Sequence, residues 1–154
     1  MGITVALADL DATARLAAAL APLLRAGDVV ALEGDLGAGK TAFARALIRE
    51  LTKGDEEVPS PTFTLVQTYE APDFDIWHFD LYRLEKSEDA FELGIEDAMA
   101  EGVTLIEWPD RLGSYLPRNR LVVRMDYADV ESARVATLSG GGDWRDRLGG
   151  LAHE

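Results

Sequence analysis

Residues 34–41 read Gly-Asp-Leu-Gly-Ala-Gly-Lys-Thr, and this stretch restricts the possible folds more than any other part of the chain. It matches the phosphate-loop pattern, in which two glycines enclose four residues and are followed by a lysine and a hydroxyl residue. The run 28–33 before it is largely apolar and predicts a buried strand. Residues 42–48 after it combine good helix formers with apolar residues at helical spacing. Strand, glycine loop and helix are the context that the motif requires, so we predict an α/β fold.

The residue types in this loop suit phosphate binding. Glycines permit backbone conformations in which successive N–H groups point inward at phosphate oxygens. A helix that starts near Lys40 adds its positive N-terminal end beneath the same phosphates. Lys40 is then expected to bridge the β- and γ-phosphates, and the hydroxyl of Thr41 to bind Mg²⁺. The sequence therefore predicts binding of a nucleoside triphosphate or diphosphate, and a chance glycine-rich turn is the much weaker alternative.

The chain has 154 residues, the size of one domain, and shows no internal repeat or linker. We therefore predict a single domain over 1–154, in which 140–154 form a glycine-rich turn and a short helix or C-terminal tail. The absence of cysteine excludes disulfides and thiolate metal sites. The N-terminus lacks a basic region followed by an apolar core, and no apolar run approaches membrane-spanning length. The expected location is the cytoplasm, without membrane attachment.

The formal net charge is −13, from 15 Lys and Arg against 28 Asp and Glu. Such a surface repels a polyanion over most of its area, so we expect no stable direct binding to nucleic acid. An acidic surface suits docking to a basic protein face, although simple solubility is the favoured explanation.

The remaining segments extend the α/β pattern. The alternating run 3–7 predicts a strand at a sheet edge, and Asp9 or Asp11 can cap the helix that follows. Two β-branched and aromatic runs lie on either side of a proline turn and predict an antiparallel pair. Those two runs cover 62–69 and 75–81; further helices are expected at 87–91 and 95–100, and further strands at 103–106, 121–125 and 133–138.

A phosphate loop needs a second carboxylate that holds Mg²⁺ directly or through water, usually at the end of a neighbouring strand. Glu107 follows an apolar run and ends a predicted strand, and Asp80 ends another in the same way. The carboxyl edge of an open α/β sheet is where ligands bind. For each residue alone an ordinary surface carboxylate is the favoured reading, yet the phosphate loop favours a functional role for at least one of them.

Other residues near these positions have two readings each. The segment 60–62, Ser-Pro-Thr, is either a loop that senses the γ-phosphate or a proline turn that enters a strand. Trp108, beside Glu107, either covers the site or packs in the core. His78 lies on an apolar strand, which favours a hydrogen-bonded core residue over a catalyst. Near the C-terminus we expect Trp144 to be a packing anchor, and Arg145 and Arg147 to be solvated.

Read in order, five segments resemble the bacterial TsaE (formerly YjeE) family, the ATPase of tRNA threonylcarbamoyladenosine biosynthesis. The resemblance covers residues from about Leu10 to Arg134, and beyond the generic phosphate loop its motifs are very specific. They are the loop at 34–41, Ser-Pro-Thr-Phe at 60–63, His-Phe-Asp-Leu-Tyr-Arg at 78–83, Glu-Leu-Gly-Ile at 92–95 and Glu-Trp-Pro at 107–109.

The resemblance implies a three-layer, P-loop NTPase-like fold with a largely parallel central sheet and antiparallel additions. It also implies a weak, Mg²⁺-dependent ATPase that works in complex with the proteins TsaB and TsaD. In the family, TsaD transfers the threonylcarbamoyl group to the adenosine beside the anticodon, and the ATPase resets the complex between turnovers.

The resemblance also assigns roles to residues of this sequence. Thr41 and Glu107 are expected to ligate Mg²⁺, and Thr62 and Asp80 to lie near the γ-phosphate and its attacking water. Whether Asp80 positions that water or acts through a metal-bound water is left open. Trp108 is expected to flank the site. The predicted phosphate-binding residues are Gly34, Gly37, Ala38, Gly39, Lys40, Thr41 and Ala42, and the predicted base-binding residues are Asp9, Leu10 and Arg134.

Two other functions remain open at this level. A small-molecule kinase has the same loop, but it usually closes a mobile basic lid over the phosphates, and the sequence contains no arginine-rich lid segment. A nucleotide sensor without turnover is the other alternative. The sequence also lacks an Asn-Lys-x-Asp-like segment of the kind that selects guanine, which favours ATP.

Overall fold

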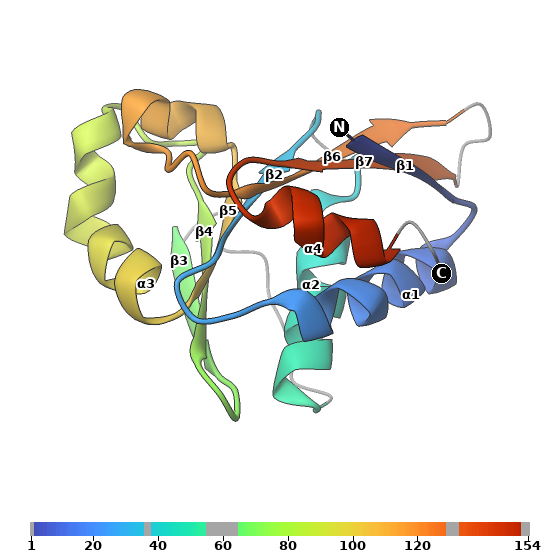
Figure 1. The fold of residues 1–154 in the computed structure, drawn as a ribbon. Coiled ribbons are helices and arrows are strands. Elements are labelled where there is room, and N and C mark those ends of the chain that lie inside the picture. The colour runs from blue at the N-terminus through green and yellow to red at the C-terminus, as the bar shows by residue number, and fades with distance from the viewer. Residues whose placement is uncertain (1, 36–37, 55–64, 129–132, 152–154) are drawn as a thin grey trace.

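The structure is a computed structural model that describes residues 2–35, 38–54, 65–128 and 133–151. Its centre is one seven-stranded mixed sheet with the strand order β1-β7-β6-β2-β5-β4-β3 (Figure 1). The predicted α/β class is confirmed.

Four neighbouring strands in the middle of this sheet are parallel. Strand β2 pairs with β6 on one side and with β5 on the other, and β5 pairs with β4. Side chains of β2 and β5 are buried on both faces, as their continuous apolar sequences require. The four strands are β6 (Leu121–Tyr127), β2 (Val29–Glu33), β5 (Val103–Glu107) and β4 (Asp75–Asp80).

Antiparallel strands extend the sheet on both sides. Strand β7 (Arg134–Gly140) pairs with β6, and β1 (Gly2–Leu7) pairs with β7 as the edge strand that the sequence predicted. At the other edge β3 (Val66–Glu70) pairs antiparallel with β4, which confirms the predicted pair.

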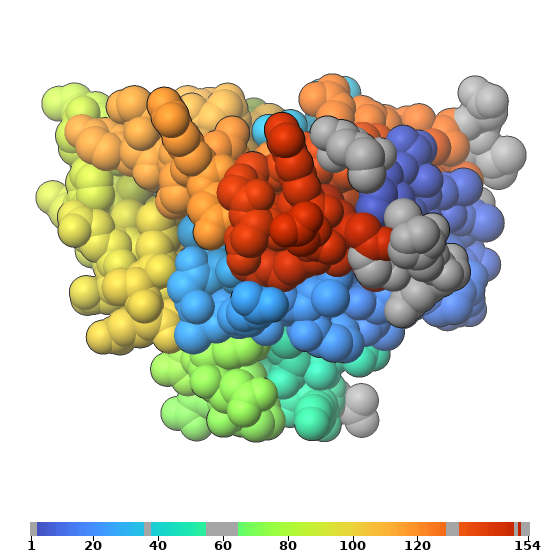
Figure 2. All heavy atoms as spheres, viewed as in Figure 1, coloured from blue at the N-terminus to red at the C-terminus, as the bar shows by residue number. Residues whose placement is uncertain are grey.

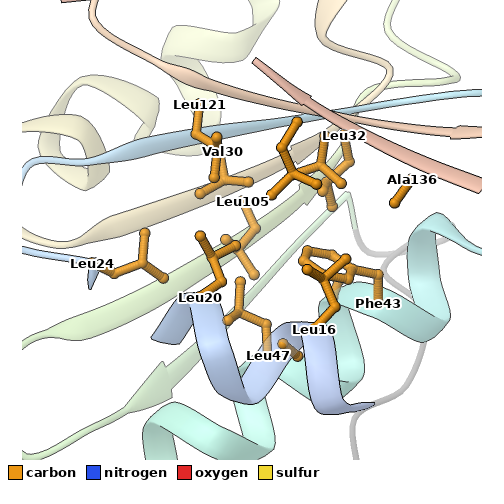
Figure 3. Close-up of a cluster of buried hydrophobic side chains, with 14 of the residues drawn as sticks. Leu16, Leu20, Leu24, Val30, Leu32, Phe43, Leu47, Leu105, Leu121 and Ala136 are labelled. Atoms are coloured by element: carbon orange, nitrogen blue, oxygen red, sulfur yellow. The ribbon is translucent and has the colours of Figure 1, made fainter. Parts of the chain in front are cut away.

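One face of the sheet is covered by helices that present leucine stripes to it (Figure 3). The Asp9 carboxylate caps the first helix by accepting a hydrogen bond from the Ala12 N–H at 2.9 Å. Leu16 and Leu20 of that helix and Phe43 and Leu47 of the next are buried against the sheet. The elements on this face are α1 (Leu10–Leu20), the short 3₁₀ turn η1 (Ala21–Leu23), α2 (Lys40–Thr52) and α4 (Trp144–Leu151).

A second, smaller apolar cluster lies on the opposite face. It joins Phe79 and Ile106 of the sheet to Ile95 and Leu112 of the covering turns and helix. These covering elements are η2 (Ser87–Leu93), α3 (Ile95–Glu101) and η3 (Pro109–Tyr115). Helical segments therefore cover both faces, and the elements form three layers.

The described part of the C-terminal segment contains a helix, and one prediction about this segment is wrong. Trp144 is buried, as expected of a packing anchor. Arg147, however, is not solvated: its guanidinium makes two hydrogen bonds with the buried carboxylate of Asp28, at 2.6 and 2.9 Å. It also donates to the Leu23 carbonyl at 2.9 Å. Figure 2 shows the C-terminal helix lying directly on the segment that connects α1 to β2.

Within the residues that the structure describes, no helix is both long enough and apolar enough to cross a membrane.

Candidate functional site

The phosphate-loop motif begins where β2 ends, at the carboxyl edge of the parallel strands. Gly34 has a φ of +136°, and a Cβ at this position would collide with the carbonyl oxygen of Met125 on β6. Gly39 has a φ of +107° and directly precedes the first turn of α2, which has no side-chain cap. Glycine is therefore required at both ends of the loop, for close approach to β6 at one end and for the left-handed turn into α2 at the other.

Lys40 is buried although it carries an ammonium group, with only 4% of its surface exposed. Its Nζ donates to the Gly34 carbonyl at 2.7 Å and lies 3.4 Å from the centre of the Trp108 ring. Burial lowers the pKa of Lys40, and the nearby carboxylates, Glu107 first and Asp80 second, oppose that shift. The amine thus lies beside the first glycine of the loop, near carboxylates that favour its charged form.

Trp108 adopts a backbone conformation that is rare for a bulky residue, with φ 60° and ψ 54°. This left-handed turn follows β5 directly and brings the indole over Lys40. The ring of Tyr82 packs against the same indole, with 4.9 Å between ring centres. Trp108 thus lies against Lys40 and also packs, partly buried, against the apolar cluster on the second face, so the geometry does not choose between its two readings.

Glu107 lies at the last position of β5 and connects the helix to the sheet. The Thr41 hydroxyl donates to Glu107 Oε1 at 2.9 Å, and His78 Nε2 lies 2.7 Å from Glu107 Oε2. Both His78 and Glu107 are almost completely buried. Because the Thr41 O–H is directed at the carboxylate, the hydroxyl oxygen keeps its lone pairs for another partner.

Asp80 ends β4 at the same level of the sheet, opposite Glu107 in the parallel register. It is buried, with 5% of its surface exposed, and one of its oxygens accepts a hydrogen bond from the Tyr82 N–H at 3.0 Å. The two carboxylates predicted from strand ends therefore lie on neighbouring strands beside Lys40, and the prediction that both follow strand termini is confirmed.

A hollow of about 240 Å³ opens beside Lys40 and Trp108. Its lining includes Lys40 and Trp108, together with Arg124 of β6. Its remaining lining residues are Leu32, Glu33, Gly34, Asp35, Pro109 and Asp110.

Of the three predicted base-binding residues, Arg134 lies on β7, and Asp9 and Leu10 follow β1, which pairs with β7. Arg134 begins β7 and pairs in register with Leu7, the last residue of β1, two residues before Asp9. A Cβ built on Gly39 would lie 3.9 Å from Arg134 Cγ, so this arginine also borders the phosphate-loop helix. Leu10 starts α1 and is 74% exposed. The pairing of β1 with β7 thus brings the end of β1, two residues before Asp9, beside Arg134.

Some predicted residues fall elsewhere. Gly37 in the loop and the segment 60–62, with Thr62, lie outside the described residues. Ala38 is buried, and Ala42 lies in the first turn of α2. In the part of the chain that is described, no group of three or more His, Cys, Asp or Glu side chains forms a ready metal cluster.

Sequence reasoning missed two contributions to the site. It did not connect His78 with Glu107, although His78 stands two residues before Asp80 on a strand and so shares its face. It also missed Arg124, which lines the hollow and lies 4.0 Å from a Glu33 oxygen. Only the pairing of β6 with β2 reveals that arginine, and no local pattern signals it.

Known proteins match this chain in sequence and in structure. The family model "Threonylcarbamoyl adenosine biosynthesis protein TsaE" matches residues 7–136. The tRNA threonylcarbamoyladenosine biosynthesis protein TsaE of Rickettsia bellii is 41% identical over 119 residues, which cover 77% of this chain and 83% of that protein. The TsaE protein of a Nostoc species is 39% identical over 139 residues, covering 86% and 83% of the two chains.

Among solved structures, the crystal structure of YdiB from Bacillus subtilis superposes with a TM-score of 0.83. It is 27% identical, and the match covers 99% of this chain and 95% of that one. The family match spans the loop, both buried carboxylates and the Glu-Trp-Pro turn. The chain belongs to the TsaE family of tRNA threonylcarbamoyladenosine biosynthesis proteins.

Proposed function

We propose that this chain is a Mg²⁺-dependent ATP-binding protein and weak ATPase that acts with TsaB and TsaD in tRNA threonylcarbamoyladenosine formation. In this proposal it is a single cytoplasmic domain with a P-loop NTPase-like fold. The observation that carries the proposal is the convergence of Lys40, Thr41, Glu107 and Asp80 at the carboxyl ends of β2, β5 and β4.

Phosphate binding is supported by the start of α2. The first-turn N–H groups of a helix have no partners within the helix and attract anions, and no side chain of the described residues caps α2. The Lys40 ammonium lies beside them and contacts the Gly34 carbonyl and the Trp108 ring. A phosphate oxygen can take the place of these contacts. Gly34, Ala38, Gly39 and Ala42 provide the neighbouring backbone, with Gly37 as a further expected contributor.

Metal binding is supported by the oxygen atoms of Thr41 and Glu107. Mg²⁺ prefers oxygen ligands and usually takes one or two from protein, with the remainder from phosphates and water. A hydroxyl that donates to a carboxylate and keeps its own lone pairs fits that requirement. When bound, Mg²⁺ neutralises charge on the β- and γ-phosphate oxygens.

Hydrolysis in this proposal is the in-line attack of water on the γ-phosphate, with Lys40 stabilising the developing negative charge. Asp80 is the residue that positions the water, and Thr62 contributes from the segment 60–62. The indole of Trp108 flanks the phosphates and limits the access of bulk water. Asp9, Leu10 and Arg134 hold the base end of the nucleotide.

The partner role follows from family membership and from charge. A net charge of −13 disfavours direct tRNA binding, so the tRNA is contacted by the partners and not by this chain. Binding and hydrolysis of ATP then change the affinity for TsaB and TsaD through contacts that differ between the two nucleotide states.

The test is Mg²⁺-dependent ATP turnover by this protein alone and with purified TsaB and TsaD. Turnover should be slow alone, should rise with the partners and should disappear in Lys40→Ala. Lys86→Ala is the matched control, because Lys86 is an exposed lysine outside the site. Background turnover in every mixture, with ATP still bound, would reject the ATPase and leave a nucleotide sensor.

A further inference from the structure

His78 is a fully buried imidazole in the middle of a sheet, and its one described hydrogen bond goes to Glu107. Its Nε2 lies 2.7 Å from Glu107 Oε2. Its other ring nitrogen, Nδ1, is also buried and has no partner within the described residues. A hydrogen bond to a carboxylate requires a donor, so Nε2 carries a proton in this pair.

The sheet explains why the ring reaches this carboxylate. His78 pairs in register with Leu105, and Asp80 pairs with Glu107 two residues further along both strands. Side chains two residues apart share a face, so His78, Asp80 and Glu107 all project toward α2. His78 thus lies two residues before the carboxyl end of β4, behind the Glu107 carboxylate, and it does not line the hollow.

The two oxygens of Glu107 are held by side chains on two different elements. Thr41 of α2 holds Oε1, and His78 of β4 holds Oε2. A carboxylate with only one donor can rotate about its terminal bond, whereas two donors on different elements fix its plane. A buried carboxylate oxygen without a partner also carries a desolvation cost, so the bond to His78 sets the orientation of Glu107 as well as its solvation.

We propose that His78 is a positioning residue, which holds the Glu107 carboxylate in the orientation that Mg²⁺ binding requires. The inference rests on the proposed function of Thr41 and Glu107. An apolar residue would fill the same buried space at lower cost, so a purely packing role does not explain an imidazole here. Partners of metal ligands typically change metal affinity about 10- to 100-fold when they are removed.

The experiment measures metal coupling directly and without turnover. The dissociation constant of a non-hydrolysable ATP analogue is determined by calorimetry, once with Mg²⁺ and once with a chelator. The constant in chelator divided by the constant with Mg²⁺ is the ratio that is compared among variants. His78→Leu should reduce this ratio by about 10- to 100-fold, while binding in the chelator stays near wild type. His78→Gln carries an N–H donor at about the place of Nε2 and should retain most of the ratio.

Thr104→Val is the matched control. Thr104 is a fully buried polar residue of β5, and its hydroxyl has no partner within the described residues. This variant should keep the wild-type ratio. If His78→Leu does not unfold cooperatively, His78→Asn replaces it. The shorter amide of Asn cannot reach Glu107, so the ratio should fall in His78→Asn while it stays near wild type in His78→Gln.

The possible results separate the two claims. A wild-type ratio in His78→Leu or His78→Asn would overturn the positioning role and leave the proposed metal site intact. A loss in His78→Gln equal to that in His78→Leu would also overturn it, because the donor would then not matter. If the wild-type protein itself binds the analogue equally well with and without Mg²⁺, the metal role of Thr41 and Glu107 fails, and the inference fails with it.

Discussion

Strand β2 has a buried charged group at each end, and the two ends differ in how completely those charges are paired. At its start, Arg147 donates to Asp28, Asp143 and the Leu23 carbonyl, and its guanidinium lies on the Trp144 ring. At its finish, the Lys40 ammonium has one carbonyl oxygen and the face of one indole as its described contacts.

The difference distinguishes structural charges from functional ones. A guanidinium has five N–H donors, and those of Arg147 are all directed at protein acceptors. Nothing remains for a ligand there. An ammonium has three donors, and among the described residues Lys40 uses one of them, on a carbonyl beside an open hollow. We therefore expect changes at the first end to alter stability, and changes at the second to alter nucleotide chemistry.

The largest effect should follow Arg147→Met. Removing the guanidinium leaves the Asp28 carboxylate buried and uncompensated, which typically costs about 3–5 kcal/mol of unfolding free energy. For a chain of this size the melting temperature should fall by roughly 6–20 °C. Thermal unfolding measures the fall, and Arg145→Met, an exposed neighbour on the same helix, should change little. Equal small losses in both variants would remove the contrast between the two ends.

Lys40→Met should show the opposite pattern. Loss of one charged donor aimed at developing negative charge typically lowers a rate by about 10²- to 10³-fold. The unfolding free energy should stay the same or rise, because a buried amine is replaced by an apolar chain of similar length. Parallel assays of ATP turnover and urea unfolding test both parts. A variant that keeps its turnover, or that loses stability as Arg147→Met does, would contradict the comparison.

A smaller effect should follow Asp143→Asn, within the first end itself. Asp143 contacts Arg147 at 2.9 Å, but its side chain is 47% exposed, whereas that of Asp28 is 7% exposed. Exposed ion pairs contribute about 0–1 kcal/mol, because water screens them. Chemical unfolding of Asp143→Asn should therefore show less than about 1 kcal/mol of destabilisation. A loss of unfolding free energy as large as that of Arg147→Met would mean that ion pairing itself, and not the burial of the pair, determines how much these contacts stabilise the protein.

The weakest expected signal is a dependence of stability on pH at the second end. Burial lowers the pKa of Lys40 below its ordinary 10.5, so the unfolded chain holds the proton more tightly than the folded one. Between the lowered pKa and 10.5 the unfolded state binds more protons, and stability therefore rises with pH across that window. The stability advantage of Lys40→Met over wild type should shrink there as pH rises. Lys86→Met should show no such trend in melting temperatures, because Lys86 is exposed.

The two ends also differ in how far the sequence predicts them. The strand, the glycine loop and the helix of the second end are local in sequence, so their pattern identifies Lys40 and Thr41 directly. Glu107 and Asp80 follow from a second local rule, since each is an acid at the end of an apolar strand. The parallel pairing of β2, β5 and β4 then brings these ends together at one edge of the sheet.

The first end could not be predicted in this way. Arg147 and Asp28 are separated by 119 residues, and neither stands in a motif. Nothing in residues 144–151 distinguishes Arg147 from its neighbour Arg145, because the choice depends on which face of α4 meets the sheet. The bond between His78 and Glu107 is intermediate: spacing on β4 puts His78 on the right face, but its partner is revealed only by the register between strands.

The ion pair between Arg147 and Asp28 has a practical consequence for where the chain can be truncated. The family match ends at residue 136, inside β7, and a truncation chosen from it would remove α4. Such a fragment would lose the buried Trp144 and would leave Asp28 without its cation, at the start of the strand that leads into the phosphate loop. Fusion partners and cleavage sites therefore belong after residue 151. Loss of activity in a shortened protein would reflect the loss of the Arg147–Asp28 ion pair and not of a catalytic group.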